Sequence, residues 1–166
     1  MRPEALSAEL RRGRGPYLAR RRAVAGLSLV AIGAMGMIAL YQLGLIEHLP
    51  DPPLPFFDAD AVDASAEAYA RLAMPDGALG LGSYAATLGL AAAGGAARAT
   101  DQPWLPLLLA AKVGLDAAVA GKLTADQWTR HRAFCAWCLL ASAATCASVP
   151  LVLPEARAAW RRLRGR

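Results

Sequence analysis

The stretch AVAGLSLVAIGAMGMIALYQLGLI, from Ala23 to Ile46, contains no charged side chain. The hydrocarbon core of a bilayer is about 30 Å thick, and an α-helix crosses it with ~20 consecutive apolar residues. Because the stretch has this length and composition, it predicts a helix that spans a membrane.

Three more apolar stretches of similar length follow along the chain. The sequence is 56% hydrophobic with a mean hydropathy of +0.32, and its charges are gathered in short blocks rather than in amphipathic periods. This pattern is typical of a bilayer protein and not of a soluble core. It predicts an all-α, integral membrane four-helix bundle, whose later spans are Gly77 to Ala97, Pro103 to Leu123 and Ala133 to Leu153.

The basic residues predict the orientation of these spans. The arginines between residues 11 and 22 would suit a signal peptide, but the apolar run is too long and lacks an A-x-A cleavage site, so we expect a retained anchor. Thirteen of the 18 Lys and Arg residues fall on the N-terminal arm, the second connection and the C-terminal tail. The positive-inside rule then places both termini in the cytoplasm. The opposite face keeps Arg71, Lys122, Arg130 and Arg132.

These assignments divide a protein of the inner membrane into three parts. Residues 1–22 form a basic cytoplasmic arm, residues 23–153 a four-span membrane domain, and residues 154–166 a basic cytoplasmic tail. Because the arginines flank apolar runs, we attribute the net charge of +5 to topology rather than to a nucleic-acid partner. The expected surroundings are membrane lipid.

The connection at residues 47–76 is expected to lie outside the cytoplasm. It is acidic, and its prolines between residues 50 and 55 favour extended geometry. Residues 58–72 can form one short helix that caps the bundle or lies on the membrane surface. The face expected to pack comprises Val62, Ala66, Tyr69 and Ala70.

Two later spans carry features that bear on packing. The Gly-rich and Ala-rich second span lets helix backbones approach closely. In the third span, Lys112 and Asp116 are four residues apart, so they share a face and should neutralise each other inside the bundle. This pair could line a substrate cavity or proton route, or it could only fix packing.

The fourth span carries the three cysteines. Thr124 and Gln127 match a capping box, so a helix is expected to begin near Ala125, while Pro150 and Pro154 are expected to weaken and end it. Cys135 and Cys138 then lie three residues apart on one helix face, close enough to form a disulfide. Cys146, eleven residues after Cys135, is expected to be a small buried side chain.

The C-x-x-C pair at the outer edge of a span suggests redox chemistry. Thiols at this depth could exchange with an exported disulfide and reduce a lipid-soluble quinone. The basic residues Arg130 to Arg132 could activate Cys135 or merely reach the lipid surface. A metal site with His131 is the alternative, but zinc sites usually have four ligands and no further pair is visible, so no metal is expected.

FCAWCLL, from Phe134 to Leu140, and MPDGALGLGSYA, from Met74 to Ala85, resemble the vitamin K epoxide reductase family in its bacterial, quinone-linked branch. The resemblance runs from about Arg22 to Leu153. It implies that Cys135 exchanges with a shuttle cysteine and that Cys138 faces ubiquinone or menaquinone. The implied quinone-site residues are Asp76, where the family often has Asn, together with Tyr84 and Ser142, which stands where some members carry Tyr.

The sequence departs from the family pattern in the exported connection. Other members carry two shuttle cysteines there, whereas residues 50–74 contain none, and Asp60 stands roughly at the second position. Two hypotheses follow. Either the pair exchanges directly with an exported thioredoxin-like protein, or the chain is a non-catalytic four-span protein with an assembly or interaction role.

Overall fold

The computed structural model describes residues 2–70 and 72–165, so Arg71 and Arg166 lie outside the described residues. The described chain is all-helical and contains no strand. Its elements are α1 (Pro3–Arg12), α2 (Leu18–Gln42), α3 (Ala59–Asp63), a 3₁₀ helix (Ala66–Tyr69), α4 (Asp76–Ala92), α5 (Arg98–Asp101), α6 (Trp104–Asp126), a π turn (Gln127–His131) and α7 (Ala136–Arg164).

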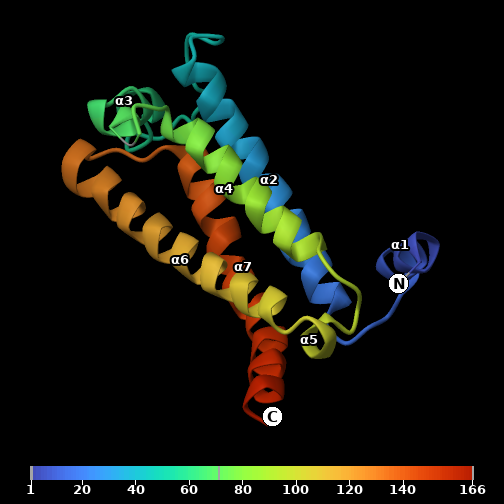
Figure 1. Ribbon diagram of the computed structural model, residues 1–166. Coiled ribbons are helices and arrows are strands. Elements are labelled where there is room, and N and C mark those ends of the chain that lie inside the picture. Colours follow the sequence, from blue (N-terminus) through green and yellow to red (C-terminus); the bar gives the residue numbers. More distant parts are fainter. Residues whose placement is uncertain (1, 71, 166) are drawn as a thin grey trace.

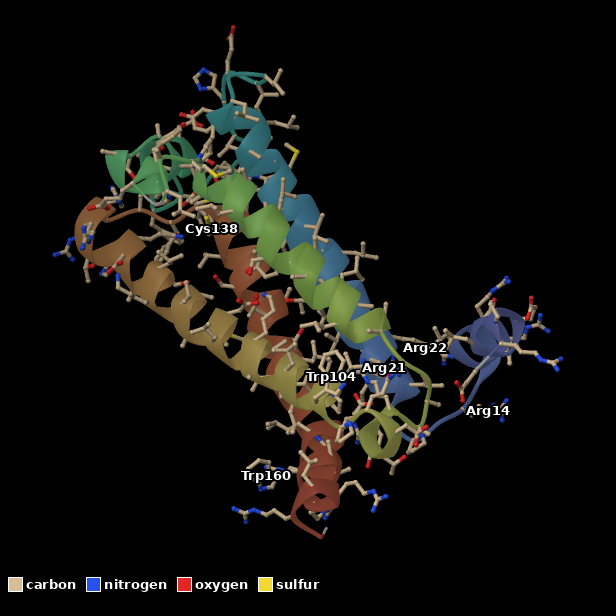
Figure 2. All side chains as sticks on the ribbon, in the orientation of Figure 1. Arg14, Arg21, Arg22, Trp104, Cys138 and Trp160 are labelled. Carbon is tan, nitrogen blue, oxygen red and sulfur yellow. The ribbon has the colours of Figure 1, made fainter. Side chains whose placement is uncertain are left out.

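The four long helices α2, α4, α6 and α7 form the body of the molecule (Figure 1). α2 packs along α4, and α7 packs against both α2 and α6, whereas α4 and α6 touch less. The connection between α2 and α4 lies at one end of this bundle, and the two termini and α5 lie toward the other. Figure 2 shows Cys138 at the end with the connection and Arg14, Arg21 and Trp160 toward the opposite end.

Three helices among the described residues are long and apolar enough to cross a membrane. They are α2, α6 with its π turn, and α7. The expectation of an all-α membrane protein is therefore supported. α4 has 17 residues and is not among the three, so the second predicted span, Gly77 to Ala97, stays a prediction, and so does the total of four.

The turn before α7 does not follow the predicted capping box. α6 and its π turn continue as helix to His131, and the chain reverses at Arg132, whose φ of 55° is left-handed. Thr124 Oγ1 lies 3.4 Å from Ser142 Oγ, and Gln127 Oε1 accepts a hydrogen bond from the backbone of Cys135. The helix start expected near Ala125 is therefore wrong, because both residues bind across the helix pair instead of capping a new helix.

The predicted end of the last helix is also wrong. α7 passes through Pro150 and Pro154 and continues to Arg164. A proline inside a helix removes one backbone hydrogen bond, but packing against neighbouring helices can compensate for it. Here Glu155, Ala156 and Ala159 are buried beyond the second proline, so packing holds the extension in place.

The expected single helix over residues 58–72 is divided into two short pieces. α3 is capped by Asp58, whose Oδ1 accepts from Ala61 N at 2.9 Å, and the chain breaks before the 3₁₀ helix. Val62 is buried as expected, but the other residues of the predicted face are exposed because the break changes the helical phase. Those exposed residues are Ala66, Tyr69 and Ala70.

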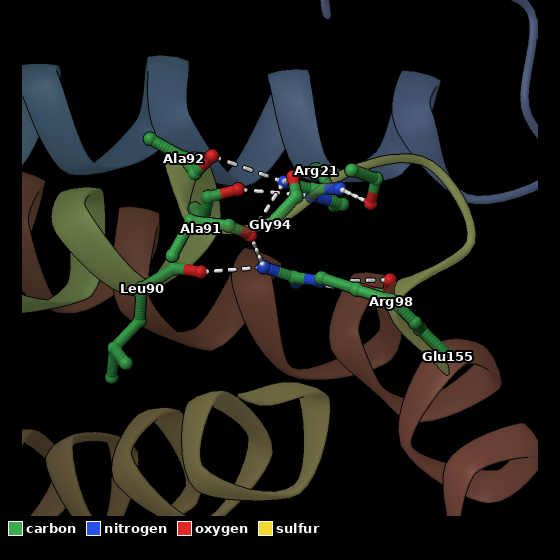
Figure 3. A network of polar contacts seen from close by, with 9 residues as sticks. Arg21, Leu90, Ala91, Ala92, Gly94, Arg98 and Glu155 are labelled. Carbon is green, nitrogen blue, oxygen red and sulfur yellow. Dashed lines mark hydrogen bonds and ion pairs between the residues drawn. The ribbon is translucent and has the colours of Figure 1, made fainter. Parts of the chain in front are cut away.

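At the end with the termini, two buried arginines close the C-terminal end of α4 (Figure 3). The last carbonyls of a helix have no partner within it. Arg21 donates to five successive carbonyls, the last two of α4 and the three that follow it, from Ala91 O to Gly95 O, at 2.9–3.2 Å. Arg98 donates to Leu90 O and Ala93 O. A role in topology alone therefore does not describe these arginines.

Arg98 also pairs with a carboxylate of α7. Its Nε and Nη2 donate to the two oxygens of Glu155 at 2.9 and 2.8 Å, and the two side chains are 0% and 4% exposed. The bidentate pair joins the α4–α5 connection to the extension of α7. It explains why helix continues beyond Pro154.

Close packing of α2 on α4 depends on glycine at the start of α4. A Cβ on Gly77 would lie 2.9 Å from the backbone nitrogen of Ala39, whereas a Cβ on Gly82 would meet nothing within 4 Å. The expected close approach of the second apolar stretch is confirmed at this position. We expect Gly77→Val to lower the free energy of unfolding by about 1–3 kcal/mol through overpacking.

Thermal unfolding of the detergent-solubilised protein measures this effect. Gly82→Val is the matched control, because it adds the same side chain to the same helix in open space. Equal unfolding temperatures for the two variants would contradict the inferred contact.

Candidate redox site

The segment between α6 and α7 presents the cysteine pair. After the reversal at Arg132 the chain is extended, and Phe134 pairs with the connection: its N donates to Phe56 O at 2.8 Å and its O accepts from Asp58 N at 3.1 Å. Cys135 then caps α7, because its Sγ accepts from Cys138 N at 3.2 Å. The first cysteine therefore lies at the helix edge and not within a helical face.

The two thiols differ in exposure. Cys135 is 0% exposed, and Cys138 is partly buried. Between them, Trp137 Nε1 donates to Pro50 O at 2.9 Å. The connection from α2 to α4 thus covers Cys135 on the side away from the bundle.

A carboxylate that was not among the predicted site residues lies beside the pair. Asp63 is 1% exposed, and its Oδ1 accepts from Cys138 Sγ at 3.6 Å. Its Oδ2 has no hydrogen-bond partner. Burial, with smaller contributions from the charges of Asp76 and Asp51, raises the pKa of Asp63 to about 6, although the contacts with the two thiols oppose this shift.

Asp63 could have been recognised from its position in the sequence. Ala59, Val62 and Asp63 have the i, i+3, i+4 spacing of one helix face. The first two are apolar and buried, so the acid shares their buried side. A carboxylate on an otherwise apolar helix face was the available signal, and it indicates that Asp63 is buried but not that it contacts Cys138.

Gln42, at the end of α2, joins Asp63 to the start of α4. Its Nε2 donates to Asp63 O at 3.1 Å and to Asp76 Oδ1 at 2.7 Å. Its Oε1 accepts from Gly77 N at 3.0 Å. The Gln42 amide thus links the end of α2 to Asp63 of the connection and to the start of α4.

A cavity of about 290 Å³ extends from Cys138 between α4, α6 and α7. Its walls are mainly apolar, and Leu115 and Val119 of α6 belong both to its lining and to the exposed surface. The cavity therefore opens toward the surface between α4 and α6. Its polar lining residues include Asp76, Ser83, Tyr84, Asp116, Gln127 and Ser142.

The structure brings four of the five predicted site residues together around this cavity. Asp76, Tyr84, Cys138 and Ser142 line it, and Cys135 does not. The Tyr84 hydroxyl accepts from Thr145 Oγ1 at 3.1 Å, which orients the phenol group. These positions are compatible with the expected roles, which remain predictions.

Asp60, at the expected second shuttle position, is oriented away from the pair. Its Oδ2 binds His48 Nδ1 at 2.7 Å, and its Oδ1 accepts from Leu49 N at 2.9 Å. The hydrogen bond to this carboxylate raises the pKa of His48. Asp60 therefore orders the start of the connection.

The basic residues before the pair are held by other partners. Arg130 forms an ion pair with Glu67, His131 Nε2 lies 3.4 Å from the same carboxylate, and the Arg132 guanidinium lies 5.8 Å from the centre of the Trp128 ring. Arg130 and His131 also line a second cavity of about 220 Å³, which Cys138 and Asp63 line as well.

The prediction that Cys146 is buried is wrong, because this residue is exposed. Cys135 precedes α7, so the helical reference for Cys146 is Cys138, eight residues earlier. At 3.6 residues per turn, this spacing rotates Cys146 by about 80° from Cys138. It therefore lies on another face of the helix.

Lys112 and Asp116 are paired inside the bundle as expected. Lys112 Nζ lies 2.6 Å from Asp116 Oδ2 and donates to Ser83 Oγ at 2.9 Å. Both charged side chains are 18% exposed. Asp116 also borders the larger cavity, so the pair contributes to its polar wall.

One group of donor atoms among the described residues is close enough to contact a shared metal ion. Asp63, Cys135 and Cys138 each offer one atom, and these atoms lie within 4.8 Å of one another. Zinc sites of three protein ligands keep an open position, whereas structural sites have four. His131, the third ligand of the sequence-based metal alternative, is not part of this group.

The helical bundle thus carries a C-x-x-C pair beside a mainly apolar cavity. The family model of the vitamin K epoxide reductase family matches residues 22–153, which is most of the chain. The chain therefore belongs to this family, and membership suggests a redox function. No curated protein and no solved structure matches it.

Proposed function

We propose that the protein is a quinone-linked thiol oxidoreductase of the inner membrane. In this proposal α4 also crosses the membrane, which brings the number of spans to four. Both termini are cytoplasmic, and the connection at residues 43–75 is exported with the cysteine pair beneath it. The observation that carries the proposal is the position of Cys138, which lines an apolar cavity open between two helices and is three residues from a second thiol.

The cavity suits the head group of a quinone. Ligand sites are mainly apolar with a few placed polar groups and have volumes of ~300 Å³ or more. The present cavity is at this lower limit, and its opening between α4 and α6 would let an isoprenoid tail extend into lipid. Tyr84, Asp76 and Ser142 are the polar groups that would contact the quinone oxygens.

The chemistry is a two-electron exchange. A bound quinone would accept two electrons and two protons and become a hydroquinone. Cys138 faces the cavity and would donate the electrons as its sulfur bonds to Cys135 Sγ. The resulting Cys135–Cys138 disulfide would be reduced again by an exported thiol partner, with a thioredoxin-like protein as the expected class.

Direct exchange at Cys135 requires a movement of the connection. Cys135 has no exposed surface, and Phe56, Asp58 and Pro50 are hydrogen-bonded to its flanking residues. An external disulfide can reach this sulfur only when those three hydrogen bonds open. Partner binding is the expected trigger.

The same burial favours a second candidate function, a non-catalytic membrane subunit. The connection contains no cysteine, and Cys135 is covered. In such a protein the pair would keep one redox state whatever the quinone pool does. The two candidates differ in this property.

Thiol trapping distinguishes them. A Cys146→Ser variant, which contains only the pair, is reduced, reconstituted in lipid and mixed with a quinone or, as control, its hydroquinone. We expect quinone alone to convert both thiols to a Cys135–Cys138 disulfide, detected by mass-tag alkylation and peptide mass spectrometry. Thiols that stay reduced with quinone but are oxidised by a chemical oxidant would contradict the proposed function.

A further inference from the structure

Asp63 contacts the sulfur that borders the cavity. Its Oδ1 lies 3.6 Å from Cys138 Sγ, the carboxyl is 1% exposed, and Oδ2 has no hydrogen-bond partner. A buried polar atom without a partner is costly and uncommon. Packing alone gives no reason for an acid here, because Ala59 and Val62 on the same helix face are apolar.

Oxidation of a thiol pair requires a proton acceptor. The thiolate, not the thiol, is the nucleophile, so the S–H proton must leave as the sulfur reacts. A carboxylate is a far stronger base than neutral water. The acid closest to Cys138 Sγ by hydrogen bonding is Asp63.

We propose that Asp63 is the proton acceptor of the cysteine pair. Its carboxylate takes the proton of Cys138 Sγ, which breaks the S–H bond and forms an O–H bond on Asp63. The Cys135 thiol releases its own proton as the S–S bond forms between Cys135 and Cys138. The pair loses two electrons to the quinone, which takes up two protons from water, and Asp63 returns its proton to water, so the carboxylate is restored. The sum is two thiols and one quinone converted to one disulfide and one hydroquinone, so atoms and electrons balance.

The second cavity gives the proton a route away from the site. This space of about 220 Å³ is lined by Asp63 and Cys138 and extends to His131, whereas Asp63 does not line the quinone cavity. Asp63 thus borders both the reacting sulfur and a polar cavity. The inference rests on the proposed thiol oxidation and adds the residue that manages its protons.

The charged surroundings of Asp63 determine the pH dependence. The groups that face it are the two thiols of the α7 segment, Asp76 of α4 and Asp51 of the connection, while Gln42 of α2 is neutral. Across the second cavity lie Lys122, Asp126, Arg130, His131 and Glu67. Burial raises the pKa of Asp63 to about 6. Above this pH the carboxylate can accept a proton, and below it the group is already protonated, so oxidation slows as pH falls.

The test compares Asp63→Asn with Asp63→Glu in the Cys146→Ser background. Glu47→Gln is the matched control, because it removes an exposed acid from the same connection. Three quantities are measured in lipid over a pH range around 6: the rate of hydroquinone formation with a short-chain quinone, the rate of thiol alkylation without quinone, and the unfolding temperature. A chelator is present throughout to exclude bound metal.

We expect Asp63→Asn to slow hydroquinone formation by about 10²-fold or more and to remove the inflection near pH 6. Alkylation should stay as fast or become faster, because loss of a negative charge beside sulfur favours the thiolate. Asp63→Glu should retain part of the rate, and Glu47→Gln all of it. This opposite response of the two rates is not produced by a merely structural role.

Three outcomes would overturn the inference. Asp63→Asn could reduce quinone at the parent rate with the inflection unchanged. Alternatively, both substitutions at Asp63 could lower oxidation, alkylation and the unfolding temperature together, which indicates a structural role. A parent protein that never reduces quinone would overturn the proposed function itself, and this inference with it.

Discussion

Replacement of Cys138 by serine is expected to lower the rate of hydroquinone formation by at least about 10³-fold. The hydroxyl is a far weaker electron donor than the thiol, and the remaining Cys135 cannot form the intramolecular disulfide. Cys138 is also the cysteine of the pair that lines the cavity. Hydroquinone absorbance after mixing the reduced, reconstituted protein with quinone measures this loss.

Cys146→Ser is the control for this substitution. It makes the same change in the same helix at an exposed position, so the rate should stay near that of the wild type. Cys135→Ser should also abolish turnover, but its remaining thiol, Cys138, should react with a maleimide small enough to enter the cavity. In Cys138→Ser the remaining thiol is the buried Cys135, which should react slowly with the same maleimide. Equal alkylation rates in the two variants would contradict the different burial of the two sulfurs.

Length and hydropathy were sufficient to predict the helical membrane bundle. The apolar runs that begin at Ala23, Pro103 and Ala133 correspond to the helices long enough to cross a bilayer. Their ends were harder to predict, because capping boxes and prolines are local signals. Tertiary contacts of Gln127 and Glu155 outweigh those signals at the predicted start and the predicted end of the last helix.

The candidate site was predictable where it depends on short sequence separations. The C-x-x-C spacing indicated the thiol pair, and the resemblance indicated Asp76 and Tyr84 near Cys138. Asp63 is separated from Cys138 by 75 residues, so its contact depends on how the connection folds back. No spacing within one segment encodes that contact.

The buried arginines illustrate the same limit. Arg21 and Arg98 read as topological charges in the sequence, because basic residues beside apolar runs usually mark the cytoplasmic side. In the structure they also satisfy carbonyls at and just beyond the end of α4. The carbonyls that need partners become visible only when the helix end is known.

Arg98→Ala is expected to lower the free energy of unfolding by about 3–5 kcal/mol. The substitution leaves Glu155 as a buried charge without its partner, and it removes the donors to Leu90 O and Ala93 O. We expect a large effect for two reasons. Both side chains are almost fully buried, and the ion pair is bidentate. Chemical or thermal unfolding in detergent measures it.

The double variant Arg98→Met and Glu155→Leu separates the charge effect from the packing effect. Replacing a buried ion pair by apolar side chains of similar volume is often neutral, whereas removing one partner is not. We therefore expect the double variant to recover most of the free energy of unfolding lost in Arg98→Ala. It should not recover the part lost because Leu90 O and Ala93 O have no donor from residue 98. A single variant as stable as the wild type would show that the pair does not hold α7 against α5, and the helix beyond Pro154 would need another explanation.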